Sequence, residues 1–79
     1  MTPEEIEHLD RVLYAVRDEV FRARAKFPAF NSAHEGYAVL KEEVDELWEE
    51  VKDDSAQAAR EEAVQVAAMA VRFVTDVKP

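Results

Sequence analysis

Residues that interrupt helices are nearly absent from this 79-residue chain, which holds one Gly and three Pro. Pro3 and Pro79 lie at the ends, so that only Pro28 and Gly36 fall inside the chain. Elsewhere apolar residues recur three and four positions apart, the period of a helix that buries one face. The sequence therefore predicts an all-α fold and, at this length, a single domain spanning residues 1–79.

The first predicted helix begins after Thr2, which can form a capping box with Glu5, while Pro3 suits the first helical position. Pro28 disfavours helical geometry at the residue before it, so we expect this helix to end near Lys26. Its predicted apolar stripe consists of Ile6, Leu9, Leu13, Val16, Val20 and Phe27.

The second predicted helix begins at another capping box, formed by Ser32 and Glu35. No Gly or Pro marks its end, but one continuous helix would place Asp54 and Glu62 on its apolar seam. We therefore expect a turn at residues 53–55, with Asp54 capping a third helix. The apolar stripe of the second helix consists of Tyr37, Leu40, Val44, Leu47 and Val51.

The third predicted helix, residues 55–76, carries apolar side chains around almost its whole circumference. Such a helix must be covered on all sides, and two further helices of this size cannot do that. The sequence thus predicts a helical bundle formed by homo-oligomerisation, as a homodimer or homotetramer.

Negative charge is concentrated in the second predicted helix and the turn after it. The chain has a net charge of −8, and residues 42–54 hold eight acidic residues and one Lys. This field repels phosphate backbones, so we expect no nucleic acid partner. The block is either a solvated helix face or a site for divalent cations.

Several other classes of protein are excluded by composition. There is no Cys, so a disulfide framework and thiolate chemistry are impossible. The longest apolar run, Val66–Val71, is far shorter than the roughly 20 residues of a membrane span, and we expect no membrane partner. No secretory leader is visible, so the expected location is cytoplasmic.

The acidic residues of the second helix do not all face the same way. Glu43, Glu46 and Glu50 follow i, i+3, i+7 spacing and form a stripe beside the apolar one. Folding the chain back at the predicted turn brings Glu46 level with Glu62, and Glu43 level with Gln65. Oxygen ligands at one level suit a hard cation such as Mg²⁺.

These residues resemble a known family. Glu42-Glu43-Val44-Asp45-Glu46-Leu47, followed by Glu62-Ala63-Val64-Gln65, is similar to the EExxE…ExxD signature of the MazG-type all-α nucleoside triphosphate pyrophosphohydrolases. The stretch from His34 to Glu49 also resembles the short MazG-like proteins of phages and bacteria. The resemblance extends over roughly residues 26–75.

The resemblance implies an enzyme that hydrolyses a nucleoside triphosphate to the monophosphate and pyrophosphate with Mg²⁺, for which Mn²⁺ can substitute. It assigns the metal to Glu43, Glu46 and Glu62. Gln65 stands where the family has Asp, and its amide offers an oxygen without a charge. Glu46 or Glu50 is the expected acceptor of the proton from the attacking water.

An alternative of a different class is a non-catalytic helical interaction protein of the same fold that has lost activity at position 65. Mg²⁺-dependent release of pyrophosphate distinguishes the two hypotheses. For an enzyme, the sequence does not rank the basic residues expected to contact the triphosphate, which are Lys41, Lys52, Arg60 and Arg72.

Overall fold

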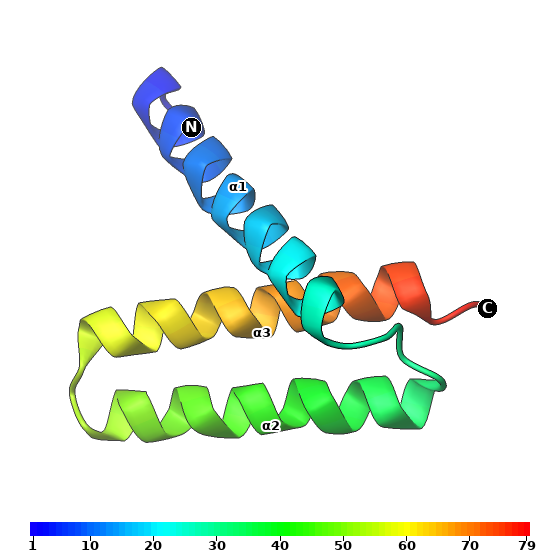
Figure 1. The fold of residues 1–79 in the computed structure, drawn as a ribbon. Helices are drawn as coiled ribbons and strands as arrows, with labels where there is room; N and C mark the ends of the chain where they lie inside the picture. The colour runs from blue at the N-terminus through cyan, green and yellow to red at the C-terminus, as the bar shows by residue number, and fades with distance from the viewer.

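The computed structural model describes all residues from 1 to 79 and contains three α-helices and no strand. The helices are α1 (Pro3–Lys26), α2 (Ala33–Lys52) and α3 (Ala56–Asp76), drawn in Figure 1. This confirms the all-α prediction and the expected end of the first helix at Lys26. None of the three helices combines the length and the apolarity that crossing a membrane requires.

The helix starts follow the predicted local signals. At α1 the full capping box forms, because the Glu5 amide donates to Thr2 Oγ1 (3.1 Å) and the Thr2 amide donates to Glu5 Oε1 (2.9 Å). At α2 the Glu35 amide donates to Ser32 Oγ at 3.1 Å. The Glu35 carboxylate, however, accepts from the side-chain amide of Asn31 at 3.1 Å, so only half of the second box is present.

The turn between α2 and α3 corrects one prediction. Asp54 does not cap α3; it has a φ of +58° and ends α2, and Ser55 takes the N-cap position without a side-chain hydrogen bond. The amide of Asp54 donates to the carbonyl of Val51, and that of Ser55 to the carbonyl of Glu50. This is a Schellman ending, in which Asp is one of the few non-Gly residues that tolerate the left-handed conformation.

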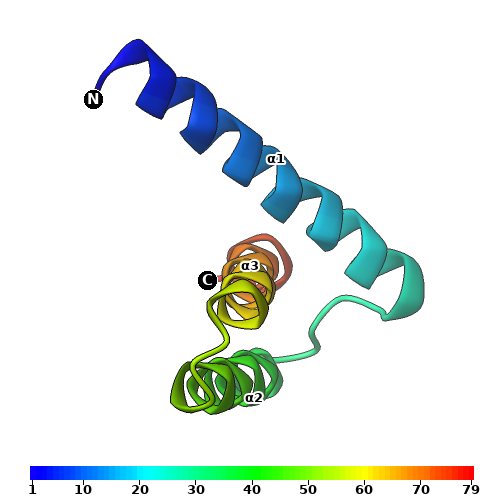
Figure 2. The same cartoon turned by 90° about the vertical axis from the view of Figure 1, so that its left-hand side faces the viewer.

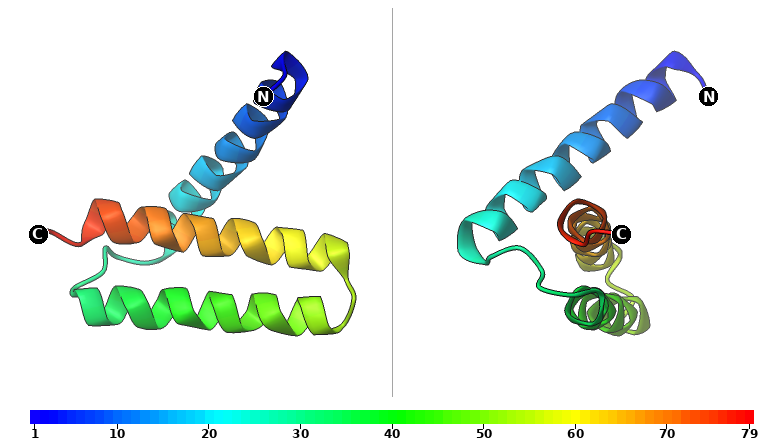
Figure 3. Two further views of the ribbon diagram at one scale, coloured as in Figure 1. Left: turned by 180° about the vertical axis from the view of Figure 1, so that it is seen from behind. Right: turned by 90° about the vertical axis from the view of Figure 1, so that its right-hand side faces the viewer.

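The three helices are arranged around α3. Helices α2 and α3 run antiparallel side by side, and α1 packs against α3 but not against α2. Figure 2, viewed nearly along α3, shows α3 lying between the other two helices. Figure 3 shows α1 crossing α3 obliquely, so that its N-terminal half leaves the rest of the molecule.

The small core lies where α1 crosses α3. Its buried members come from α1, from the loop of residues 27–32 and from α3, and they are Val16, Ala23, Phe30, Ala68 and Met69. Partly buried side chains of α2, Val39 and Leu40, pack against it. Since α1 diverges beyond this crossing, the core does not extend along its N-terminal half.

The predicted apolar stripes are therefore only partly covered. On α1 the stripe is buried at Val16, whereas Ile6, Leu9 and Leu13 are exposed. On α2 the side that faces α3 differs from the predicted stripe, because Tyr37, Val44 and Val51 are all exposed. That side instead passes through buried Gly36 and half-buried Val39 and Glu43. On α3, the expectation of all-round burial is not met within one chain, because Val71 and Val74 are exposed.

Gly36 explains why this side of α2 faces α3. A Cβ at this position would lie 2.7 Å from Cδ2 of Phe73 and 3.1 Å from Cδ2 of Phe30. Only a residue without a side chain lets α2 approach α3 this closely at the Phe73 ring. The close approach turns the Glu43 side of α2 toward α3.

A buried ion pair fixes the loop of residues 27–32 to the C-terminal end of α3. Arg72 is buried, donates from Nη2 to the carbonyl of Pro28 at 3.1 Å, and lies 4.2 Å from the centre of the Phe30 ring. Asp76 accepts a hydrogen bond from the Phe30 amide at 3.1 Å and lies 3.8 Å from Arg72 Nε. Arg24 of α1 lies 3.9 Å from the same carboxylate, which ties the end of α1 to α3.

Candidate metal centre

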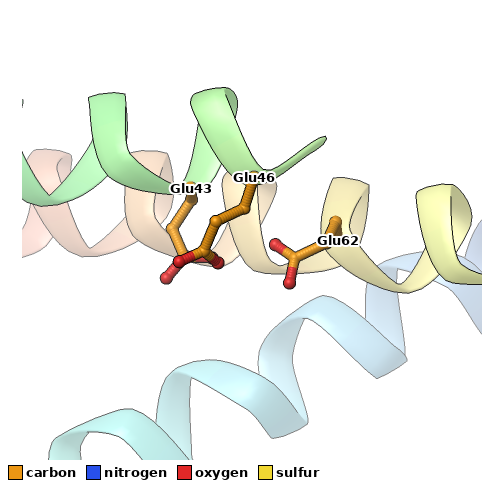
Figure 4. A group of neighbouring side chains, drawn as sticks. All are labelled: Glu43, Glu46 and Glu62. Atoms are coloured by element: carbon orange, nitrogen blue, oxygen red, sulfur yellow. The ribbon is translucent and has the colours of Figure 1, made fainter. Parts of the chain in front are cut away.

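Three carboxylates from two helices meet between α2 and α3. Glu43 and Glu46 extend from α2 and Glu62 extends from α3, with one oxygen of each within 4.8 Å of the others. Figure 4 shows the Glu43 and Glu46 carboxylates next to each other, with that of Glu62 facing them from α3. The structure thus brings together the three residues that the spacing predicts.

Two local features produce this convergence. Glu43 and Glu46 are one turn apart on α2, so their side chains share a face. The short turn after α2 makes α3 antiparallel to it, which places Glu62 level with Glu46. The site therefore depends on the position of the turn and on the closeness of the two helices, rather than on any irregular segment.

The cluster has no positive charge of its own. No Lys or Arg forms an ion pair with Glu43, Glu46 or Glu62. The pKa of Glu43 is raised to about 7, and burial is the largest cause. The carboxylates of Glu62 and Glu46 contribute to the same rise, because protonated Glu43 can donate to them whereas ionised Glu43 is repelled by them. Three acids with no counter-charge are therefore held together in the folded state.

The donor atoms fit a hard divalent cation. All three groups offer carboxylate oxygen, the ligand that Mg²⁺ and Mn²⁺ prefer. In addition, Oε2 of Glu62 is buried and has no hydrogen-bond partner, although buried polar atoms are normally paired. A cation at this position would satisfy that oxygen and remove the repulsion among the three acids.

The other predicted site residues lie near the cluster but not in it. Gln65 is half-buried, one turn after Glu62 on α3, and lines the same cavity as Glu43. Glu50 is half-buried one turn after Glu46 on α2, but it does not belong to the group of three converging carboxylates. Their roles as ligand and proton acceptor remain predictions.

The cavity beside Glu43 contains one functional candidate, Lys26, that sequence reasoning missed. The cavity has a volume of about 610 Å³, and Lys26 at the end of α1 and Phe27 directly after it contribute to its wall. The sequence did show that Lys26 lies in the last turn of the helix that ends before Pro28. It does not show how α1 crosses α3, and this crossing brings Lys26 to the cavity.

Comparison of the chain with protein-family models, with curated proteins and with solved structures gives no match. The candidate site accordingly rests on the geometry of its own residues and on the motif in residues 42–65.

Proposed function

We propose that this protein is a Mg²⁺-dependent nucleoside triphosphate pyrophosphohydrolase of the MazG type. The observation that carries the proposal is the convergence of Glu43, Glu46 and Glu62, whose carboxylate oxygens lie within 4.8 Å of one another. Three acids that repel one another and have no cationic partner are unfavourable for the fold alone, which favours a functional reason for the cluster. The resemblance of their sequence pattern to the MazG signature supplies the reaction class.

The roles of the residues follow from their positions. Glu43, Glu46 and Glu62 would hold the metal, and Gln65 would add a neutral oxygen. Mg²⁺, if held there, would supply positive charge that offsets the negative charge of the phosphate oxygens. Glu46 is exposed to solvent and Glu50 lies one turn away on the same helix, so either carboxylate could take the proton of the attacking water. Water and the triphosphate then yield the monophosphate and pyrophosphate.

A second part of the proposal is that the chain works as a homo-oligomer. Large apolar side chains are exposed on all three helices, and on α1 they continue the stripe that is buried where α1 meets α3. An exposed apolar stripe of this kind on a helix is typical of an interface. The exposed large apolar side chains include Ile6, Leu9, Leu13, Tyr37, Val44, Trp48, Val51, Val71 and Val74. Light scattering should give the mass of a dimer or tetramer, and a monomeric mass with helicity intact contradicts this part.

The proposed reaction is tested by measuring pyrophosphate release from a panel of ribo- and deoxyribonucleoside triphosphates, with Mg²⁺ and with EDTA. Activity should need Mg²⁺ and should be lost in Glu43→Gln/Glu46→Gln. Asp45→Asn/Glu49→Gln is the matched control, because it removes two charges from exposed positions of the same helix that belong neither to the cluster nor to the cavity beside Glu43.

A non-catalytic interaction protein of the same fold is the second candidate. Gln65 favours it, because an amide contributes less to cation binding than the Asp of the MazG signature. The exposed apolar side chains of α2 favour it as well. This candidate predicts no pyrophosphate release from any nucleotide, while the oligomeric mass is unchanged.

A further inference from the structure

The cavity beside the acidic cluster is large enough for a small ligand. Its volume of about 610 Å³ lies within the range of roughly 300–1,000 Å³ that is usual for such sites. Glu43 and Gln65 form part of its wall, so a ligand in the cavity would lie next to the candidate metal centre. The rest of the wall comes from the end of α1, the loop of residues 27–32, further residues of α2 and the C-terminal half of α3.

The structure separates the four basic residues that the sequence could not rank. Lys41 and Lys52 are on α2 and pair with Asp45 and Glu49, each at 3.0 Å. Arg60 lines a different cavity, between α1 and the N-terminal half of α3. Arg72 alone among the four lines the cavity that Glu43 shares.

Arg72 has hydrogen-bonding capacity that the fold does not use. Its side chain is 3% exposed, and Nε has no hydrogen-bond partner. Nη1 donates only to the sulfur of Met69 at 3.5 Å, a weak acceptor. The Asp76 carboxylate is 3.8 Å from Nε, too long for a hydrogen bond. A buried guanidinium with spare donors at a cavity wall suits an anionic ligand.

Two further cations from α1 reach the same cavity. Lys26 forms no ion pair, whereas Arg22 pairs with Asp18 at 2.8 Å and Glu19 at 3.3 Å. Lys26 therefore offers a free positive charge at the wall, opposite in sign to the Glu43 side. The ion pair between Arg22 and Glu19 also neutralises one of the acidic residues that line the cavity.

Among the other acidic residues of the wall, those of α2 near the cluster keep their negative charge unpaired. Glu35 is engaged by Asn31 through two hydrogen bonds, at 3.1 and 3.4 Å. Glu42 and Glu43 have no cationic partner. The cavity thus combines unneutralised acid, where a divalent cation would bind, with the unpaired charge of Lys26 and the spare donors of Arg72. A polyanion chelated to a divalent cation matches both parts.

We infer that this cavity holds the polyphosphate of the substrate, with Lys26 and Arg72 as the residues that position the phosphates beside the Glu43 cluster. The inference rests on the proposed function, because it assumes that a cation at the cluster joins the phosphates to Glu43. The exposed ring of Phe27 lies at the same wall and offers a flat apolar surface to the remainder of a nucleotide.

The test is calorimetric titration of the full chain with inorganic tripolyphosphate in the presence of Mg²⁺, comparing Lys26→Gln with the control Arg60→Gln. Lys26→Gln should weaken tripolyphosphate binding roughly tenfold, which is the loss of one charge-assisted contact. Its affinity for Mg²⁺ alone should not change. In the hydrolysis assay its KM should rise more than its kcat falls, because the lysine binds phosphate and transfers no proton.

Arg72→Lys provides a second variant, since it keeps the charge while removing the forked donors. It should weaken tripolyphosphate binding with helicity retained, as circular dichroism can verify. The inference is overturned if the parent does not bind tripolyphosphate, or if Lys26→Gln binds it as well as Arg60→Gln does, even when nucleotides are hydrolysed. If binding depends on Lys26 but no nucleotide is hydrolysed, the cavity assignment stands and the proposed function fails.

Discussion

Glu43 of α2 and Glu62 of α3 place carboxylate oxygens within 4.8 Å of each other, although the two residues belong to different helices. Each is half-buried, and one oxygen of Glu62 has no hydrogen-bond partner. The turn after α2 and the close approach at Gly36 both act to hold this pair together. The packing of α2 against α3 around Phe73 therefore opposes the repulsion between the acidic side chains of the cluster.

The first prediction concerns the stability conferred by a divalent cation. Mg²⁺ or Mn²⁺ should raise the melting temperature, because it binds the cluster of Glu43, Glu46 and Glu62 only in the folded state. At a concentration of one hundred times the Kd the gain is about 2.7 kcal/mol, or several degrees for a domain of this size. Differential scanning fluorimetry with Mg²⁺ and with EDTA measures the shift.

The matched variants separate this site from the general negative charge. Glu43→Gln/Glu46→Gln should lose the Mg²⁺ effect, whereas Asp45→Asn/Glu49→Gln should keep it, because Asp45 and Glu49 lie outside the cluster and the cavity. Equal responses of the two double variants would mean that the cation acts by screening and not at the cluster.

The second prediction is a pH dependence of the metal-free protein. The pKa of Glu43 is raised to about 7 in the folded state, above its value in the unfolded chain, so between these values the folded state binds more protons. The stabilising contribution of protonated Glu43 is complete at acidic pH below the unfolded pKa. It is lost as the pH rises through about 7.

Thermal melts in EDTA between pH 4.5 and pH 8 measure this dependence. The parent should lose more stability over that interval than Glu43→Gln, which has no proton to release. Conversely, Mg²⁺ should stabilise the parent more at pH 8 than at pH 5, because the cation needs ionised carboxylates. Parallel curves for the parent and Glu43→Gln would refute the shift.

The third prediction concerns the contact between α2 and α3. Gly36→Ala should destabilise the protein by about 1–3 kcal/mol, although Ala is the better helix former. The reason is that the new Cβ would lie 2.7 Å from Cδ2 of Phe73. Urea denaturation measures the change, and Phe73→Leu in the same chain should reduce the cost by vacating the space. A Gly36→Ala protein as stable as the parent would show that α2 and α3 are not held by this contact.

The fourth prediction concerns position 65. Gln65→Asp should strengthen Mg²⁺ binding and increase nucleotide hydrolysis, because a carboxylate replaces a neutral oxygen near Glu43 and one turn from Glu62. Asp is one methylene shorter than Gln, which affects the size of the change and not its sign. Calorimetric titration with Mg²⁺ gives the comparison. Binding no better than in the parent would remove position 65 from the site and weaken the family resemblance.

Local sequence signals predicted the helix ends and the acidic cluster well. The cap at Thr2 and the break before Pro28 act within a few residues, so they do not depend on tertiary packing. The alignment of Glu46 with Glu62 could be found by counting from the turn, because two antiparallel helices joined by a short turn leave little freedom in register. The misassignment of Asp54 had a local cause, since Asp can cap a helix or end one in the left-handed conformation.

The parts that could not be predicted depend on how the helices pack. Periodicity identifies an apolar stripe but does not say how much of it the rest of the chain covers, and so Leu9 and Val44 were expected in the core although both are exposed. The oblique crossing of α1 over α3 likewise follows from side-chain packing between distant residues. That crossing brings Lys26 into the cavity beside Glu43, which explains why sequence spacing alone missed it.

In the proposed function, the cluster of Glu43, Glu46 and Glu62 supports hydrolysis of a nucleoside triphosphate. ³¹P NMR at saturating Mg²⁺ can follow the reaction products for the parent and for Glu43→Gln/Glu46→Gln. The parent should form monophosphate and pyrophosphate in equal amounts, and the double variant should form neither while remaining helical. Unchanged nucleotide across the panel with the parent, or equal turnover by the double variant, would contradict the proposed function.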